Sequence, residues 1–279
     1  MWNSDFKPDS GSGHFHLDKW YLDFAGDEGE AMIFYAACLS WRGFEVHYTS
    51  WLRYDPIKGV TQRSAFRNIH MPEKTNDLIT WSDEKFGIWG RWEAIASPLF
   101  ARLYDSDSGY LEWKCYQPAS RVELVAGQRN YKGTGYAEQL ILTLPPWKMP
   151  LHELRWGRFG SRENQLVWIE IREEVKQQWV WLNGIRVEGC SIEDDLIILS
   201  GKGLTLKLDK GVVLESENKI NTVVDKLQGL LPGFKRIIPL QFLLAEECKW
   251  FSNGVLYSGD DVVSSGPAIH EKVNFKPTV

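Results

Sequence analysis

The chain has 279 residues, of which 32 are basic and 37 acidic, and its formal net charge is −5 at pH 7. This length suffices for one large β domain or two smaller ones. An acidic chain without clustered Lys and Arg lacks the electrostatic footprint of nucleic-acid binding, so we expect no nucleic-acid partner. The 14 Trp, 10 Tyr, 13 Phe and 24 Gly are typical of pleated sheets lined by aromatic side chains.

The sequence predicts neither a membrane span nor a metal site. Its longest apolar run covers only residues 31–39, which is too short for a transmembrane helix. Residues 1–5 lack both the basic and the apolar region of a secretory signal, so we expect a cytoplasmic protein. The four cysteines show no C-x-x-C spacing and are interpreted as free thiols, and His14-x-His16 lacks a third ligand in sequence. No feature specifies an oligomeric state.

Most segments alternate between apolar and polar residues with the period of two that is typical of strands. The Asn183-Gly184 pair predicts a hairpin with a type I′ turn, because these residues tolerate positive φ angles. One amphipathic helix is predicted over 218–231, where apolar residues recur at helical spacing before Pro232-Gly233. The predicted strands cover residues 16–24, 31–41, 44–53, 86–93, 111–116, 179–182, 185–188, 196–200, 204–208 and 212–216.

A linker is predicted at 144–150, where three prolines in seven residues are incompatible with a central strand. It divides the chain into an N-terminal β domain, 1–148, and a C-terminal β domain, 149–279. Pockets form preferentially at such junctions.

Two stretches carry candidate functional residues. In the first, residues 16–24, alternation places Trp20 on one face and Tyr21 with Asp23 on the other. The second flanks the linker and concentrates a carboxylate, an imidazole, two guanidinium groups and two large aromatic side chains. These are Glu138, His152, Arg155, Arg158, Tyr136 and Trp156.

The Trp-Tyr-Leu-Asp-Phe strand at 20–24, the Gly-Tyr-Ala-Glu segment at 135–138 and the Trp-Gly-Arg segment at 156–158 carry a family resemblance. The chain resembles the two-domain lipocalin-like superfamily of carotenoid 1,2-hydratases, tocopherol cyclase and fungal decalin-forming cyclases. This implies an all-β fold with two tandem lipocalin-like antiparallel β-barrel domains, here with one amphipathic helix in the second half. Gln139-Leu140-Ile141 replaces the Asn-Trp-Gly that often follows the acid in the cyclases, so the resemblance specifies no substrate.

The function we expect is a cofactor-independent cyclase, isomerase or hydratase for a hydrophobic small molecule, such as an isoprenoid or polyketide, bound at the domain junction. Burial would keep Glu138 protonated as the acid, His152 would relay a proton or order a water, and Arg158 would polarise a carbonyl. The residues expected to bind the substrate are Trp20, Trp41, Tyr136, Arg155 and Trp156.

Other interpretations stay open at this point. Glu138 would be structural if it paired with Arg155 or Arg158 across neighbouring strands, and Tyr136 and Trp156 would then only fill a barrel. A second hypothesis is a non-catalytic carrier of the same fold that binds a lipid, pigment or terpenoid. A carbohydrate-binding β-sandwich, with tryptophans as sugar platforms, is a further alternative.

Overall fold

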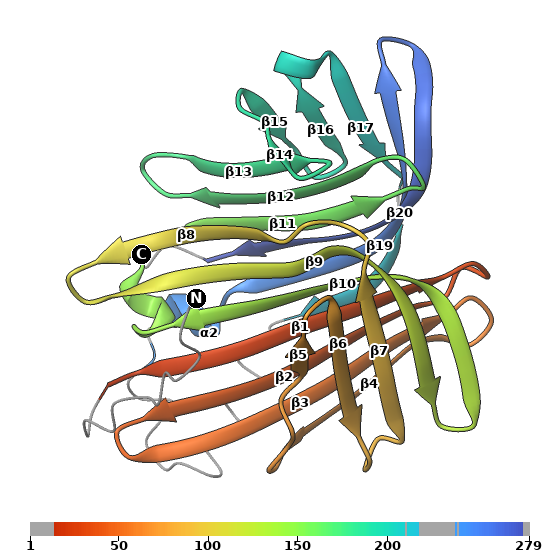
Figure 1. Cartoon of the computed structure of the whole chain (residues 1–279). Coiled ribbons are helices and arrows are strands. Elements are labelled where there is room, and N and C mark those ends of the chain that lie inside the picture. Colours follow the sequence, from red (N-terminus) through yellow and green to blue (C-terminus); the bar gives the residue numbers. More distant parts are fainter. Residues whose placement is uncertain (1–13, 210, 218–237, 239, 276–279) are drawn as a thin grey trace.

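Two antiparallel sheets of ten strands each form the molecule, and the chain builds one after the other (Figure 1). The computed structural model describes residues 14–209, 211–217, 238 and 240–275. The predicted all-β class, with two tandem lipocalin-like barrels, is confirmed. The helix predicted at 218–231 lies outside the described residues, and the helix that is described, α2 (Leu240–Leu243), is short. No helix within the described ranges is long and apolar enough to cross a membrane.

The first sheet has the spatial order β4-β3-β2-β1-β10-β9-β7-β6-β5, and β8 pairs with β9 off this path. Its strands are β1 (His16–Gly26), β2 (Ala31–Trp41), β3 (Phe44–Asp55), β4 (Gly59–Phe66), β5 (Glu73–Thr75), β6 (Leu78–Asp83), β7 (Ile88–Ala94), β8 (Leu99–Ser106), β9 (Gly109–Ala126) and β10 (Arg129–Leu142).

The second sheet repeats this order ten strands later as β14-β13-β12-β11-β20-β19-β17-β16-β15, with β18 paired to β19. The two halves therefore share one topology, and β1 and β11 are equivalent central strands. The strands of the second sheet are β11 (Glu153–Gly160), β12 (Gln165–Arg172), β13 (Gln177–Leu182), β14 (Ile185–Arg186), β15 (Cys190–Ile192), β16 (Leu196–Leu199), β17 (Leu204–Leu208), β18 (Val212–Glu217), β19 (Glu246–Ser258) and β20 (Asp261–Asn274). Two 3-10 turns, η1 (Pro146–Lys148) and η2 (Ser200–Lys202), complete the described elements.

The predicted hairpin at Asn183-Gly184 is confirmed. Both residues have positive φ, 51° and 79°, as a type I′ turn between β13 and β14 requires. The strand predicted over 86–93 starts later, at Ile88, because Phe86 and Gly87 form the preceding turn and Gly87 has a φ of 67°. The strand predicted over 185–188 ends at Arg186.

Each sheet buries both of its faces, so the described residues form three apolar cores. One core, with Phe34 and Trp92, fills the concave face of the first sheet, and another, with Phe159 and Trp168, fills that of the second. The third core lies between the sheets. There Trp113 of β9 stacks on Trp181 of β13, with ring centroids 5.0 Å apart. We call this third core, together with the polar groups within it, the junction.

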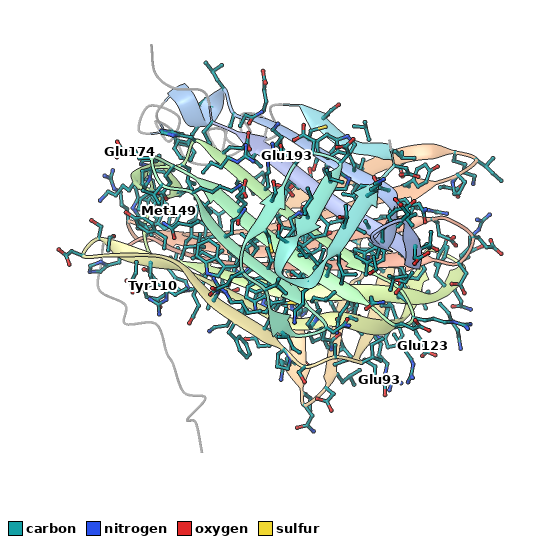
Figure 2. The ribbon with its side chains drawn as sticks, turned by 90° about the horizontal axis from the view of Figure 1, so that it is seen from above. Glu93, Tyr110, Glu123, Met149, Glu174 and Glu193 are labelled. Carbon is teal, nitrogen blue, oxygen red and sulfur yellow. The ribbon has the colours of Figure 1, made fainter. Side chains whose placement is uncertain are left out.

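The chain passes from one sheet to the other between Leu142 and Glu153, through a stretch that contains the predicted proline linker. The division into domains at residue 148 stays a prediction. Seen from above, Met149 of this connection and Glu123 of β9 lie at opposite ends of the molecule, and side chains fill the space between the ribbons (Figure 2).

Because β11 packs closely on the core of the second sheet, one methyl group added to this strand should destabilise the fold. A Cβ added at Gly157 would lie 2.1 Å from the Trp168 ring, which is fully enclosed, so Gly157→Ala should lower the free energy of unfolding by about 1–3 kcal/mol. Urea denaturation would measure this. Gly160→Ala is the matched control on the same strand, because the nearest atom to its added Cβ is 4.0 Å away. Equal midpoints for the two variants would contradict this account of the packing.

Candidate functional site

The junction carries a cluster of polar and aromatic side chains on one face of β1 and β10. Tyr21 is the cross-strand partner of Glu138, and Asp23 is the partner of Tyr136, so these four side chains point the same way. The pairing of β10 with β9 is irregular between Gly135 and Glu138. Such bulges redirect side chains and are frequent beside active sites.

Glycine is required at position 135 for the backbones to approach one another here. A Cβ at Gly135 would lie 2.3 Å from the carbonyl oxygen of Asp23 and 3.1 Å from Nε1 of Trp92. Trp92 Nε1 donates a hydrogen bond of 2.7 Å to that same carbonyl. The Gly-Tyr-x-Glu segment therefore fixes the backbone of β1 as well as the position of its own acid.

Glu138 lies at the centre of the cluster, with 9% of its surface exposed. Three donors converge on its Oε2 atom: the Tyr136 hydroxyl at 2.5 Å, Nε1 of Trp156 at 3.2 Å, and Nε1 of Trp113. Burial raises the pKa of Glu138, and the hydrogen bonds from Tyr136, Trp113 and Trp156 offset only part of that rise. The carboxyl group is thus biased toward its protonated form.

An ion pair crosses the junction beside this acid. Arg158 of β11 donates from Nε to Asp23 Oδ2 at 2.9 Å and from Nη2 to Asp23 Oδ1 at 2.5 Å, and both side chains are buried. The Tyr21 hydroxyl donates to Asp23 Oδ2 at 3.2 Å. Such bidentate geometry is the strongest form of carboxylate recognition by arginine.

Aromatic rings enclose the acid and this ion pair. Trp156 meets Tyr21 and Tyr136 edge to face, with centroids 5.0 and 5.4 Å apart, and Tyr21 meets Tyr35 in the same way at 5.4 Å. Burial raises the pKa values of Tyr21, Tyr35 and Tyr136 well above their usual range. These phenols therefore remain neutral hydrogen-bond donors at ordinary pH.

A buried cation lies on the other side of Tyr35. Lys249 of β19 is fully buried and donates to the Tyr35 hydroxyl at 2.7 Å. Burial by itself would lower the pKa of Lys249, but Glu271, Tyr35, Glu247 and Glu215 raise it well above its usual range. The nearest of these carboxylates is Glu271, at 2.8 Å. The ammonium group is therefore charged, and it orients the Tyr35 hydroxyl.

The structure brings together four of the eight residues predicted from sequence, namely Tyr136, Glu138, Trp156 and Arg158. In the part of the chain that the structure describes, Glu138 forms no ion pair with Arg155 or Arg158. Among the described residues, Arg158 pairs with Asp23, whereas Arg155 pairs with Glu153 and Asp194.

The other four predicted residues lie outside this cluster, although Trp41 packs against the periphery of the junction. Trp20 faces the first concave core and stacks on Tyr116, and Trp41 packs against Phe15 and Trp147. His152 is exposed, before β11. Arg155 points to the opposite face of β11 from Trp156, because neighbouring residues of a strand alternate.

Sequence reasoning did not select five further residues of this cluster: Tyr21, Asp23, Tyr35, Trp113 and Lys249. Alternation places Tyr21 and Asp23 on one face of β1, which was a usable signal. No local pattern marks Trp113 as a partner of Glu138 or Lys249 as a partner of Tyr35, because the members of each pair are distant in sequence.

Arg155 lines a small hollow on the concave side of the second sheet, together with Trp168, Asp194, Trp250, His270 and Lys272. The His270 ring stacks on Trp250, with centroids 5.0 Å apart, and its Nε2 lies 3.0 Å from Ser252 Oγ. Burial lowers the pKa of His270 to about 4. This imidazole is therefore neutral in the folded protein.

Comparisons with known proteins support the fold. No protein-family model and no curated protein matches the sequence. A structure from Nitrosomonas europaea described as AttH aligns with 97% of this chain and 96% of its own, with a TM-score of 0.55 at 9% identity. CghA with Sch210972 aligns over 94% and 89%, with a TM-score of 0.51 at 10% identity. At such identities the similarity shows the fold alone, and it confirms the lipocalin-like fold that the sequence resemblance implies.

Loss of the ion pair between Asp23 and Arg158 should lower the stability of the fold. Asp23→Asn would leave the Arg158 charge buried without a counter-ion, so we expect the free energy of unfolding to fall by about 3–5 kcal/mol in urea denaturation. Glu93→Gln is the control, because its 3.8 Å contact with Arg91 is exposed and should matter by less than about 1 kcal/mol. A loss no larger than that of the control would mean that the junction does not depend on this pair.

His270 should make stability sensitive to acid. Its pKa is about 4 when folded and about 6.5 when unfolded, so the unfolded state binds more protons between these values. Stability attributable to the neutral ring is present above about pH 6.5 and is lost as the pH falls toward 4. His270→Gln should flatten the profile of unfolding free energy over this interval, as measured by urea titrations at a series of pH values. An unchanged slope would contradict the assignment.

Proposed function

We propose that this chain is a cofactor-independent enzyme that protonates a hydrophobic small molecule at the junction, with Glu138 as the acid. One observation carries the proposal: the Glu138 carboxyl group is buried among aromatic rings, and this burial raises its pKa although three donors on its Oε2 atom favour the carboxylate. A carboxylic acid kept protonated near neutral pH is what alkene or enone protonation requires. The fold neighbours are compatible with this proposal, since their overall architecture is the same.

The chemistry follows from the surroundings of the acid. Proton transfer from Glu138 to a substrate double bond would leave a carbocation and a carboxylate. In a hydration, water would capture the cation and then lose a proton to the Glu138 carboxylate. In a cyclisation, an internal double bond would capture the cation, and the new cation would lose a proton to the same carboxylate. In an isomerisation, the first cation would lose a proton from a neighbouring carbon to Glu138. The ring faces of Tyr136 and Trp156 would stabilise the cation by about 0.5–2 kcal/mol each. Exclusion of bulk water by the enclosing rings would prevent premature capture.

Arg158 has a positioning role in this proposal. Its Nε and Nη2 atoms are engaged by Asp23, which in turn accepts a hydrogen bond from Tyr21. The pair would fix β11, and with it Trp156, against β1. A pocket at the junction is part of the proposal, and substrate would enter where Glu138 and Trp156 retain 9% and 8% of their surface.

A non-catalytic carrier of the same class of ligand is the second candidate. It is favoured by the close contacts among Tyr21, Tyr136 and Trp156, which by themselves would form a stable aromatic ligand surface. A carbohydrate-binding surface has less support. Among the tryptophans that the structure describes, Trp89 alone is exposed, so no pair of exposed rings forms a sugar platform there.

The experiment compares wild type with Glu138→Gln, which preserves shape but cannot donate a carboxyl proton. Both proteins would be incubated with an organic extract of small molecules from the source cells, and products would be followed by liquid chromatography and mass spectrometry. We expect the variant to form product at least 100-fold more slowly, because general acid catalysis contributes about 10²–10⁴-fold. Glu123→Gln, at an exposed position of β9, should retain wild-type turnover.

Two results would count against the enzyme. Equal turnover by Glu138→Gln and wild type would remove the acid role from Glu138. Co-purification of a single unchanged ligand, with no product from either protein, would establish the carrier instead. Thermal melting of each variant would separate loss of chemistry from loss of fold.

A further inference from the structure

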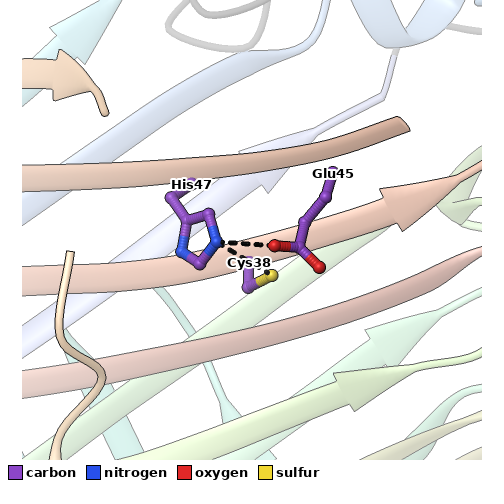
Figure 3. A group of neighbouring side chains, drawn as sticks. All are labelled: Cys38, Glu45 and His47. Atoms are coloured by element: carbon purple, nitrogen blue, oxygen red, sulfur yellow. Dashed lines mark hydrogen bonds and ion pairs between the residues drawn. The ribbon is translucent and has the colours of Figure 1, made fainter. Parts of the chain in front are cut away.

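Three side chains with metal-binding atoms converge on the β2–β3 hairpin. None of them belongs to the cluster around Glu138. Cys38 of β2 is the direct cross-strand partner of His47 of β3, and Ser40 is the partner of Glu45. Residues two apart on a strand share a face, so Cys38, Glu45 and His47 project from the same side of the sheet. Figure 3 shows their side chains pointing toward one another.

The atoms that would bind a metal are already close together. His47 Nε2 lies 3.0 Å from Glu45 Oε1 and 3.8 Å from Cys38 Sγ, and the three ligand atoms all lie within 4.8 Å of one another. Zinc bonds of about 2.3 Å to sulfur, 2.0–2.1 Å to nitrogen and 2.0–2.2 Å to oxygen separate tetrahedral ligand atoms by about 3.3–3.6 Å. The two measured separations bracket this range, so small side-chain rotations would complete the geometry.

The face on which this cluster lies is the concave face of the first sheet. Ala36, two residues before Cys38, belongs to the concave core, and Thr49, two residues after His47, is buried and donates to Asp83 at 3.1 Å. The cluster therefore continues the core toward its open end and is supported by fixed neighbours. Glu138 belongs to the opposite face, because its cross-strand partner Tyr21 alternates with the core residues Trp20 and Leu22.

A surface ion pair between His47 and Glu45 explains only part of this arrangement. Such a pair needs no thiol, yet Cys38 Sγ lies beside the same nitrogen. The His47 side chain is 19% exposed and that of Glu45 is 64% exposed, so the cluster is supported on its inner side and open to water on its outer side.

We propose that Cys38, Glu45 and His47 bind a divalent transition metal of the zinc class, with water in the fourth position. One sulfur, one nitrogen and one oxygen ligand form a set that suits Zn²⁺ and Co²⁺, whereas Mg²⁺ and Ca²⁺ require oxygen ligands. Three protein ligands and one open position are also the arrangement of zinc sites that activate water. The sequence predicted no metal site. Cys38 and Glu45 are seven residues apart and Glu45 and His47 two, and only the pairing of β2 with β3 brings the three side chains together.

Cobalt substitution tests the proposal directly. Untagged full-length protein, reduced and freed of metal by dialysis, would be titrated with Co²⁺ and then with Zn²⁺. We expect a near-ultraviolet thiolate-to-cobalt charge-transfer band that saturates at one equivalent and disappears when Zn²⁺ displaces Co²⁺. Cys38→Ser should abolish the band, and His47→Gln should weaken affinity at least tenfold, as loss of a ligand does. Cys190→Ser, which alters another half-buried thiol, should leave band and affinity unchanged.

Glu45→Gln keeps the test independent of folding, because Glu45 is exposed and its loss leaves the hairpin intact. This variant should retain the charge-transfer band and bind Co²⁺ about tenfold more weakly. The proposal fails if wild type shows no band at one equivalent, if the band persists in Cys38→Ser, or if Glu45→Gln binds as tightly as wild type. Far-ultraviolet circular dichroism of each variant would confirm that the sheets are intact. Because the ligands and Glu138 lie on opposite faces, these outcomes are independent of the proposed acid.

Discussion

The ion pair between Asp23 and Arg158 is the interaction on which the relation of the two sheets depends. Removing two charges from water costs several kcal/mol per ion, and only excellent geometry with further hydrogen bonds repays it. The pair meets this condition through its two parallel hydrogen bonds and the added donor from Tyr21. A displacement of β11 along β1 would break both bonds at once and leave two buried charges. The apolar contacts of the junction hold the sheets together, whereas this pair specifies one alignment.

That alignment also determines the environment of Glu138. Trp156 is two residues from Arg158 on β11, so fixing the arginine places the indole against Tyr21 and Tyr136 and its N–H on the acid. Trp113 of the first sheet donates a hydrogen bond to the acid, and its ring stacks on Trp181 of the second sheet. The pKa of Glu138 is therefore a property of the assembled junction and not of β10 alone. Separation of the sheets would hydrate the carboxyl group and remove the cause of its raised pKa.

Periodicity predicted the class of fold and part of this site, and the reason for the remainder is physical. Alternation indicates which residues share a face of a strand but not what that face contacts. Asp23 and Arg158 are 135 residues apart, so no local pattern could pair them. Applied to β11 as it was to β1, the same alternation would have separated Arg155 from Trp156, since neighbours on a strand face opposite ways. The grouping of Arg155 with Arg158 followed proximity in sequence where strand geometry requires separation.

Because the two sheets share one topology, equivalent strands meet at the junction, but the charged side chains that they contribute have opposite signs. The central strand of the first sheet contributes Tyr21 and Asp23, and that of the second contributes Trp156 and Arg158, an aromatic and a charged residue two positions apart in each case. The flanking strands differ more. β9 offers Trp113 to a buried acid, whereas its equivalent β19 offers Lys249 to three carboxylates. One side of the junction therefore holds a buried carboxyl group that accepts hydrogen bonds from neutral aromatic side chains, and the other holds a buried cation. The repeated topology therefore encloses an asymmetric interior.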